Sequence, residues 1–180
     1  HLIHIDSTFI YGYYGSSVGG TIYFCDCKYI YIDRRGLIRY VISDYAYMGD
    51  IGYVQDGHYG YVEIDGTASI NYGSSVFGGT FIEKAVLNDD GNITGKPNQG
   101  SYPLEFDTLH LAVGQTYNFK DTTTITQNGW IDAVGTGSFP IIMRSQNFGN
   151  QATIKSLNDT ICMNYIFMQD LDTAGTAIFR

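Results

Sequence analysis

Short hydrophobic runs alternate with turn residues along the second half of the chain. Between residues 106 and 175 each run is rich in β-branched or aromatic residues and closes on Gly, Asn, Asp or Pro. Gln127-Asn128-Gly129 and Asn147-Phe148-Gly149-Asn150 are two such closures. Runs this short between turn signals are typical of β-strands, and the scattered glycines disfavour helix.

Like residues recur in this half at nearly constant separation. Successive members of two hydrophobic series lie 22 or 23 residues apart. The series are Leu109, Ile131, Ile154 and Phe119, Ile141, Met163. A shared period indicates a β-solenoid in which each turn stacks its hydrophobic residues on those of the turn before. We therefore expect all six side chains to lie in core stacks.

The first half contains an internal repeat. Residues Tyr14 to Thr21 return at Tyr72 to Thr80 with one inserted residue, Phe77, and residues 3–6 are echoed by residues 62–65. The offset of 58 or 59 residues equals about three turns of roughly 20 residues, so one coil accounts for both halves. The Gly-rich elements are predicted as turns, because no Lys-Ser/Thr follows to make a phosphate-binding loop.

These patterns predict an all-β, right-handed parallel β-helix with about 20–23 residues per turn. An antiparallel β-sandwich is the alternative, since strands and turns at this density also suit that fold. Residues 1–180 are expected to form one continuous solenoid, with the repeat in 1–100 and the regular runs in 101–180. The chain begins at His1 and stops inside a strand-like run, so we expect a fragment of a larger chain.

Composition supports the β prediction and excludes some partners. The chain has 22 Gly, 16 Tyr and 10 Phe, and its net charge is −8. No basic cluster exceeds Arg34-Arg35, which argues against nucleic acid and anionic membrane surfaces. No apolar stretch approaches the roughly 20 residues that span a bilayer, so no membrane insertion is expected.

Two features allow both a structural and a functional interpretation. Cys25 and Cys27 are expected on one face of a strand, where they could form half a metal site or a redox pair. We favour the structural interpretation, in which both cysteines pack inside the solenoid as small apolar residues. Nothing nearby completes a zinc site, and Cys162 is left over. The tyrosines between Tyr40 and Tyr61 suit a carbohydrate-stacking platform, but a tyrosine ladder on the outer wall is favoured.

The sequence offers weak candidates for calcium. Asn88 to Asn92 form a turn by their chemistry, and Asp89, Asp90 and Asn92 are its candidate ligands. A solvated turn is favoured, because the spaced ligands and closing Glu of an EF-hand are missing. No other cofactor is expected.

No catalytic residue is assigned. Asp6 and Asp65 occupy equivalent repeat positions, and Asp170 and Asp172 are predicted on one side of a strand. We interpret both pairs as solvent-exposed residues on the outer face. Asp170 could alternatively form a structural ion pair with Arg144 across neighbouring turns. Three histidines share no ligand spacing and have no neighbouring nucleophile: His4, His58 and His110.

Several motifs follow one another in an order that resembles a known family. The resemblance covers about residues 79–177 and is best from 106 to 175. The motifs are Phe106-Asp107-Thr108-Leu109, Gly114-Gln115-Thr116-Tyr117, Pro140-Ile141-Ile142-Met143-Arg144-Ser145, Tyr165-Ile166-Phe167-Met168-Gln169-Asp170 and Thr173-Ala174-Gly175. The segment resembles the right-handed parallel β-helix parts of very large secreted surface proteins of Bacteroidota. Asp107 stands where that group commonly has Asn, and Thr176 where it commonly has a second Gly.

The resemblance implies an adhesin or extracellular stalk, exported by type IX secretion, attached to the outer membrane and linked to gliding motility. The expected function is therefore a non-catalytic module at the cell surface. Its expected partners are the rest of a larger parent chain, with surface glycans or other surface proteins as further candidates. Alternatives are a carbohydrate-active β-helix, either a polysaccharide lyase or a glycan-binding domain, and a phage or fibre-type spike.

Overall fold

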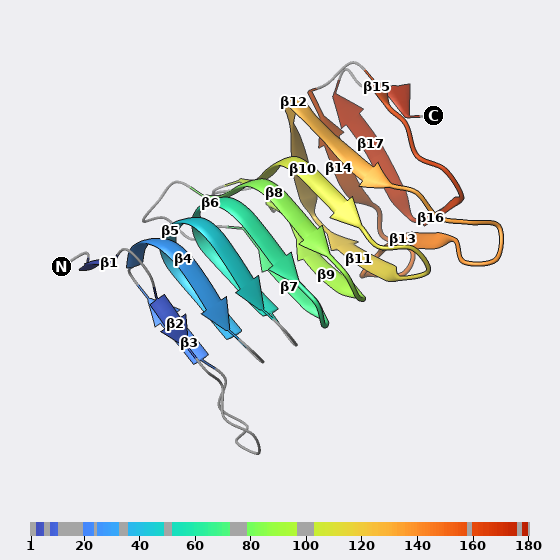
Figure 1. Cartoon of the computed structure of the whole chain (residues 1–180). Helices are drawn as coiled ribbons and strands as arrows, with labels where there is room; N and C mark the ends of the chain where they lie inside the picture. Colours follow the sequence, from blue (N-terminus) through green and yellow to red (C-terminus); the bar gives the residue numbers. More distant parts are fainter. Residues whose placement is uncertain are drawn as a thin grey trace.

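The computed structural model shows an all-β coil (Figure 1). It describes the backbone of residues 3–5, 8–10, 20–23, 25–32, 36–48, 52–72, 79–96, 103–157, 160–175 and 178–179. Side chains are described for 46–47, 54–55, 57–72, 79–96, 103–157 and 161–175. Within these ranges the chain forms no helix, and hence none long and apolar enough to cross a membrane.

Eighteen strands are described. They are β1 (Ile3–Ile5), β2 (Thr8–Ile10), β3 (Gly20–Tyr23), β4 (Cys25–Ile32), β5 (Gly36–Met48), β6 (Gly52–Ile64), β7 (Ala68–Asn71), β8 (Thr80–Leu87), β9 (Gly91–Thr94), β10 (Leu104–Leu111), β11 (Thr116–Lys120), β12 (Thr122–Ala133), β13 (Ile141–Ser145), β14 (Ala152–Ser156), β15 (Thr160–Ile161), β16 (Ile166–Gln169), β17 (Leu171–Gly175) and β18 (Ile178–Phe179).

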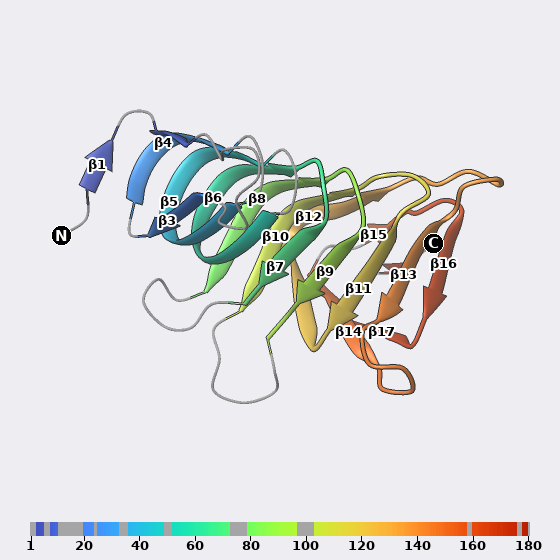
Figure 2. The same cartoon turned by 90° about the horizontal axis from the view of Figure 1, so that it is seen from below.

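All pairings between these strands are parallel, so the β-helix is confirmed and the antiparallel sandwich is wrong. Two series of strands run along the coil, β6-β8-β10-β12-β14-β17 and β7-β9-β11-β13-β16. The long strand β6 belongs to both, because its start pairs with β7 and its remainder with β8. Figure 2 shows the second series lying across the coil from the first, with β1 and β16 toward opposite ends.

The long strands β6, β8, β10 and β12 each change in their middle the side that faces the core. In β8 the in-out alternation is broken by two consecutive exposed residues, Glu83 and Lys84. Because alternation has a period of two, this break turns the two halves of the strand toward the core from different directions. The coil therefore has three walls. Wall 1 consists of the short strands β7, β9, β11, β13 and β16. Wall 2 consists of the first halves of the long strands (residues 57–59, 80–82, 104–106 and 122–126) together with β14, and wall 3 consists of their second halves (61–64, 84–87, 108–111 and 130–133).

The core consists of hydrophobic side chains stacked turn upon turn. On wall 3 one such stack is Val62, Ala85, Leu109 and Ile131, each buried and paired in register with the next. Parallel register places equivalent side chains on the same face, so each turn buries the inward residues of its neighbours. The predicted stacking of Leu109 on Ile131 is confirmed.

Tyr117 is one of the two tyrosines that are fully buried in the described core. Its ring lies over Gly91, where an added Cβ would be 3.1 Å from the Tyr117 Cδ1 atom. The buried hydroxyl donates to the Leu87 carbonyl at 2.8 Å and accepts from the Ala112 amide at 2.8 Å. Burial, reinforced by Asp90 and Asp89, raises the pKa of Tyr117, although the Ala112 amide opposes the shift.

The other predicted stacking partners are wrong. Ile154 pairs with Thr123 instead of Ile131, and Phe119 pairs with Ser145 instead of Ile141. Five of the six residues are buried as predicted, and Met163 is partly buried against the core. The register differs because the turns are unequal in length.

Turn lengths follow directly from the paired residues. Gly36 pairs with Gly52 and Gly52 with Ala68, whereas Thr80 lies opposite Gly57 and Asn118 opposite Asn92. The early turns are therefore shorter than the predicted period, and some later turns are longer. Extra residues enter between strands, where the core does not restrict chain length, and also inside β12, where Ile125 pairs with Phe106 but Trp130 pairs with Thr108.

Because the early turns are short, the repeated sequence elements do not occupy the equivalent positions in the coil that the internal repeat predicts. Val62 shares its position with Ala46, Ile30 and Thr8, not with Ile3. Thr21 lies in β3 and pairs with Leu37, whereas Thr80 begins β8 opposite Gly57, so the two Gly-Gly-Thr elements occupy different places in a turn. Asp6 and the Gly-Ser-Ser segments at 15–17 and 73–75 lie outside the described residues.

The structure bears differently on the predictions for the cysteines and for the tyrosines. Cys25 and Cys27 belong to β4, but their side chains are outside the described set, whereas Cys162 is free and exposed. Tyr59 is fully buried, which is inconsistent with a stacking platform at that position. Tyr61 is half-buried and in register with Tyr45, as a ladder along the coil requires.

Candidate functional site

A row of outward side chains crosses wall 2. His58, Phe81, Glu105, Thr124 and Lys155 lie on β6, β8, β10, β12 and β14, and each is paired in register with the next. All point away from the core, because the residues that flank them in each strand are buried. The row therefore runs along the coil axis.

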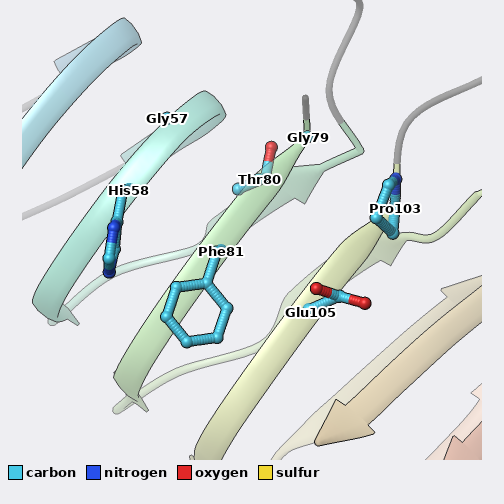
Figure 3. A pocket seen from close by; sticks show the side chains of 7 residues that line it. All are labelled: Gly57, His58, Gly79, Thr80, Phe81, Pro103 and Glu105. Carbon is cyan, nitrogen blue, oxygen red and sulfur yellow. The ribbon is translucent and has the colours of Figure 1, made fainter. Parts of the chain in front are cut away.

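The first hollow on this row has a volume of about 220 Å³ (Figure 3). The ring centroids of His58 and Phe81 are 4.8 Å apart, and the rings meet edge to face at 70°. Gly79 and Pro103 form its upper border, where the Thr80 amide donates to the Pro103 carbonyl at 2.9 Å. Gly79 has φ of +142°, and an added Cβ would lie 2.6 Å from that carbonyl oxygen, so this approach requires glycine.

A second hollow of about 390 Å³ adjoins the first, with Pro103 and Glu105 common to both. Its lining includes Thr122 and Thr124 of β12, together with Lys96 and Lys155. Lys96 is held beside β12 because its amide donates to the Thr122 carbonyl at 2.7 Å and its carbonyl accepts from the Thr122 amide at 3.1 Å. We call these two adjoining hollows the axial groove.

The charged groups of the axial groove are not neutralised by one another. Among the described residues, the side chains of Lys96, Lys155 and Glu105 make no ion pair or hydrogen bond. At the other end, His58 Nε2 lies 3.4 Å from Glu83 Oε1. The groove thus offers two ammonium groups, one carboxylate and threonine hydroxyls to a bound molecule.

Of the three calcium candidates, Asp89 and Asp90 lie in a turn between β8 and β9, as the sequence predicts. Asp89 Oδ1 accepts from the Asp90 amide at 2.8 Å, and Asp90 Oδ1 accepts from the Thr116 amide at 2.6 Å. Asn92 lies apart from them on wall 1, where its Oδ1 accepts from Asn118 Nδ2 at 3.2 Å. Within the described ranges no three His, Cys, Asp or Glu side chains gather as a metal site.

The carboxylates near the C-terminal end are not placed as predicted. Asp170 is a corner residue with φ of 52°, and its Oδ2 accepts from the Gly149 amide at 3.1 Å. Asp172 lies in the following strand, β17, so the two do not share one strand face. Arg144 donates from Nε to Asn118 Oδ1 at 2.9 Å, and the suggested ion pair with Asp170 is wrong.

Asp65 and His110 have partners that the sequence did not indicate. Asp65 accepts hydrogen bonds from Tyr47 and, at 2.8 Å, from Asn88 Nδ2. His110 Nδ1 lies 2.9 Å from Asp132 Oδ2, and the two residues are in register on β10 and β12. Both contacts are exposed and join neighbouring turns, so they are structural contacts on the outer surface.

Sequence reasoning missed the axial groove. Its residues are scattered over nearly a hundred positions, from His58 to Lys155, and only the unequal turn lengths bring them into one row. Two signals were available: outward positions flanked by inward residues, and prolines beside the irregular segment near 94–105. Without the register, neither signal identifies neighbours.

Comparison with protein-family models, curated proteins and solved structures finds no match to this chain.

Proposed function

We propose that this chain is a rigid, non-catalytic module of a larger cell-surface protein, acting as an adhesive or stalk segment. The export route and outer-membrane attachment implied by the sequence resemblance are part of the proposal. The observation that supports it most is the continuous stack of fully buried side chains across β6, β8, β10 and β12. Such a stack holds the outward side chains at fixed spacings, about 4.8 Å from strand to strand.

Contacts between turns on the outer surface add to this rigidity. Arg144, Asn118 and Asn92 form a chain of hydrogen bonds across β13, β11 and β9. Each bond alone contributes little in water. Their common direction along the axis resists sliding of one turn over the next, which is the mechanical property that a stalk or adhesin needs.

Attachment under flow tests the proposal. Beads coated with the purified chain should stay on glass coated with polysaccharide or protein at higher shear than beads coated with albumin. Beads carrying heat-unfolded chain are the control for nonspecific stickiness. Retention equal to albumin on every surface would overturn the adhesive role.

A polysaccharide lyase is the second candidate, favoured by one observation. The axial groove brings the Glu105 carboxylate and two lysines to one site, and none of the three has an ion-pair partner among the described residues. Proton abstraction next to a sugar carboxylate needs a base and a cation that stabilises the developing charge. Incubation with acidic polysaccharides, followed by ultraviolet absorbance of unsaturated products, distinguishes this enzyme from a binding module. Under our proposal no such product forms.

A further inference from the structure

We infer that the axial groove binds an acidic polysaccharide, whose chain lies along the coil axis across β6 to β14. The inference rests on the proposed adhesive function and supplies its ligand class. It is carried by two adjoining hollows, by lysine and glutamate side chains that have no ion-pair partner among the described residues, and by two rings at one end.

The dimensions favour an extended polymer. Five strands border the groove, so it spans four strand spacings, or about 19 Å. The hollows measure about 220 and 390 Å³ and lie side by side, with Pro103 and Glu105 in the lining of both. A ligand that fills both must therefore be long and narrow, with groups repeated along its length.

The lysines select for negative charge in the ligand. Lys96 and Lys155 flank β12 on opposite sides, Lys96 beside Thr122 and Lys155 in register with Thr124. Neither has a carboxylate partner among the described residues. A carboxylate placed between them would gain charge-assisted hydrogen bonds without breaking an existing ion pair.

The remaining groups select for hydroxyls instead of dense charge. Glu105 can accept from sugar hydroxyls, and the Thr122 and Thr124 hydroxyls can donate or accept. A polyanion without hydroxyls would gain nothing from Glu105 and would be repelled by it. The net charge of −8 opposes every polyanion, so the hydroxyl contacts are what favour a polysaccharide.

The rings define the other end of the site. His58 and Phe81 offer apolar ring surface beside Glu105, which suits the C–H face of a sugar ring. The polymer is thus oriented with a uronic acid unit near Lys96 and Lys155, and a sugar ring packed near Phe81.

Calorimetric titration with polygalacturonate oligomers tests the inference. The same oligomers with methyl-esterified carboxylates keep the hydroxyls and lose the charge, while polyglutamate keeps the charge and lacks sugar rings. The unmodified oligomers should bind at least about tenfold more tightly than either, because both lysines gain charge-assisted hydrogen bonds.

A charge-matched pair of double variants locates the site. Lys96→Ala with Lys155→Ala should weaken binding by at least about tenfold, and Arg at both positions should restore most of it. Lys84→Ala with Lys120→Ala removes the same charge from outside the groove, since Lys84 lies over the Tyr61 ring on wall 3 and Lys120 ends β11. That control should change affinity less than about twofold, because distant exposed charges are screened by salt.

The outcomes separate this inference from the proposed function. Equal weakening by both double variants, or equal binding of polyglutamate, would overturn the groove as a glycan site while the adhesive role stands. Absence of binding to the oligomers, together with bead attachment above albumin, would also remove only the inference. Absence of binding and of bead attachment would overturn both.

Discussion

Two methionines in register show how burial arises in this coil. Met143 on β13 and Met168 on β16 are direct neighbours on wall 1 and face the same way. Met143 is fully buried, whereas Met168 is 37 % exposed. Met143 has described turns on both sides, but β16 pairs only with β13 within the described part of the chain. An inward position is therefore buried only when a neighbouring turn covers each side.

The largest expected effect comes from truncating these two side chains. Met143→Ala should lower the free energy of unfolding by about 2–5 kcal/mol, because it leaves a cavity between two packed turns. Met168→Ala should cost less than about 1 kcal/mol, since solvent already reaches that side chain. Urea unfolding of both variants measures the difference. Equal costs would show that burial at wall 1 does not depend on covering turns.

Buried and exposed tyrosine hydroxyls should also differ in how much they contribute to the free energy of unfolding. Tyr117→Phe removes a buried hydroxyl with two partners and should lower the free energy of unfolding by about 1–2 kcal/mol. Tyr165 is 64 % exposed, so Tyr165→Phe should change it by less than about 0.5 kcal/mol. Urea midpoints at neutral pH report both values. A neutral Tyr117→Phe would contradict the role of its hydrogen bonds.

Alkaline pH should separate the wild type from Tyr117→Phe. Burial raises the pKa of Tyr117 in the folded chain, so the stability linked to its neutral form is complete below the unfolded-state pKa of about 10. That stability is lost as the pH rises from this value toward the folded pKa. Unfolding midpoints across this range should fall more steeply for the wild type. Parallel curves would mean that Tyr117 ionises as easily in the folded chain as in the unfolded one.

A small effect is also expected on the outer surface. Asn118→Ala breaks the hydrogen bonds to Asn92 and Arg144, yet it should lower the free energy of unfolding by less than about 1 kcal/mol, because water replaces both. Thermal unfolding compares this variant with Gln127→Ala, an exposed site in β12. A cost above that of Met168→Ala would show that the outer ladder stabilises the coil more than its partly covered end.

The fold class was predictable because alternation and turn residues are local signals. The parallel coil and five of six buried core residues follow from them. Register was not predictable from one assumed period, since residues inserted between strands, and inside β12, change turn length without changing the alternation of the paired segments. A shorter period was nonetheless visible in Tyr29, Tyr45 and Tyr61, which the structure pairs in sequence.

The candidate site was less predictable than the fold for the same reason. Asp89 and Asp90 lie in the predicted turn, because turn chemistry depends on adjacent residues. The axial groove instead depends on which residues of distant turns become neighbours, such as Thr124 and Lys155. An error of a few residues in turn length breaks such a pair.

Disulfide trapping tests the stacking register most directly. In a chain whose native cysteines are replaced by serine, Asn92→Cys with Asn118→Cys places two thiols on paired residues of neighbouring strands. Strands about 4.8 Å apart are within disulfide range, whereas Asn92→Cys with Arg144→Cys puts the thiols two strands, or about 9.6 Å, apart. We expect rapid oxidation of the first pair and none of the second, read as loss of free thiols and altered gel mobility. Rapid oxidation of the second pair, or none of the first, would contradict the register that forms the core stacks and the axial groove.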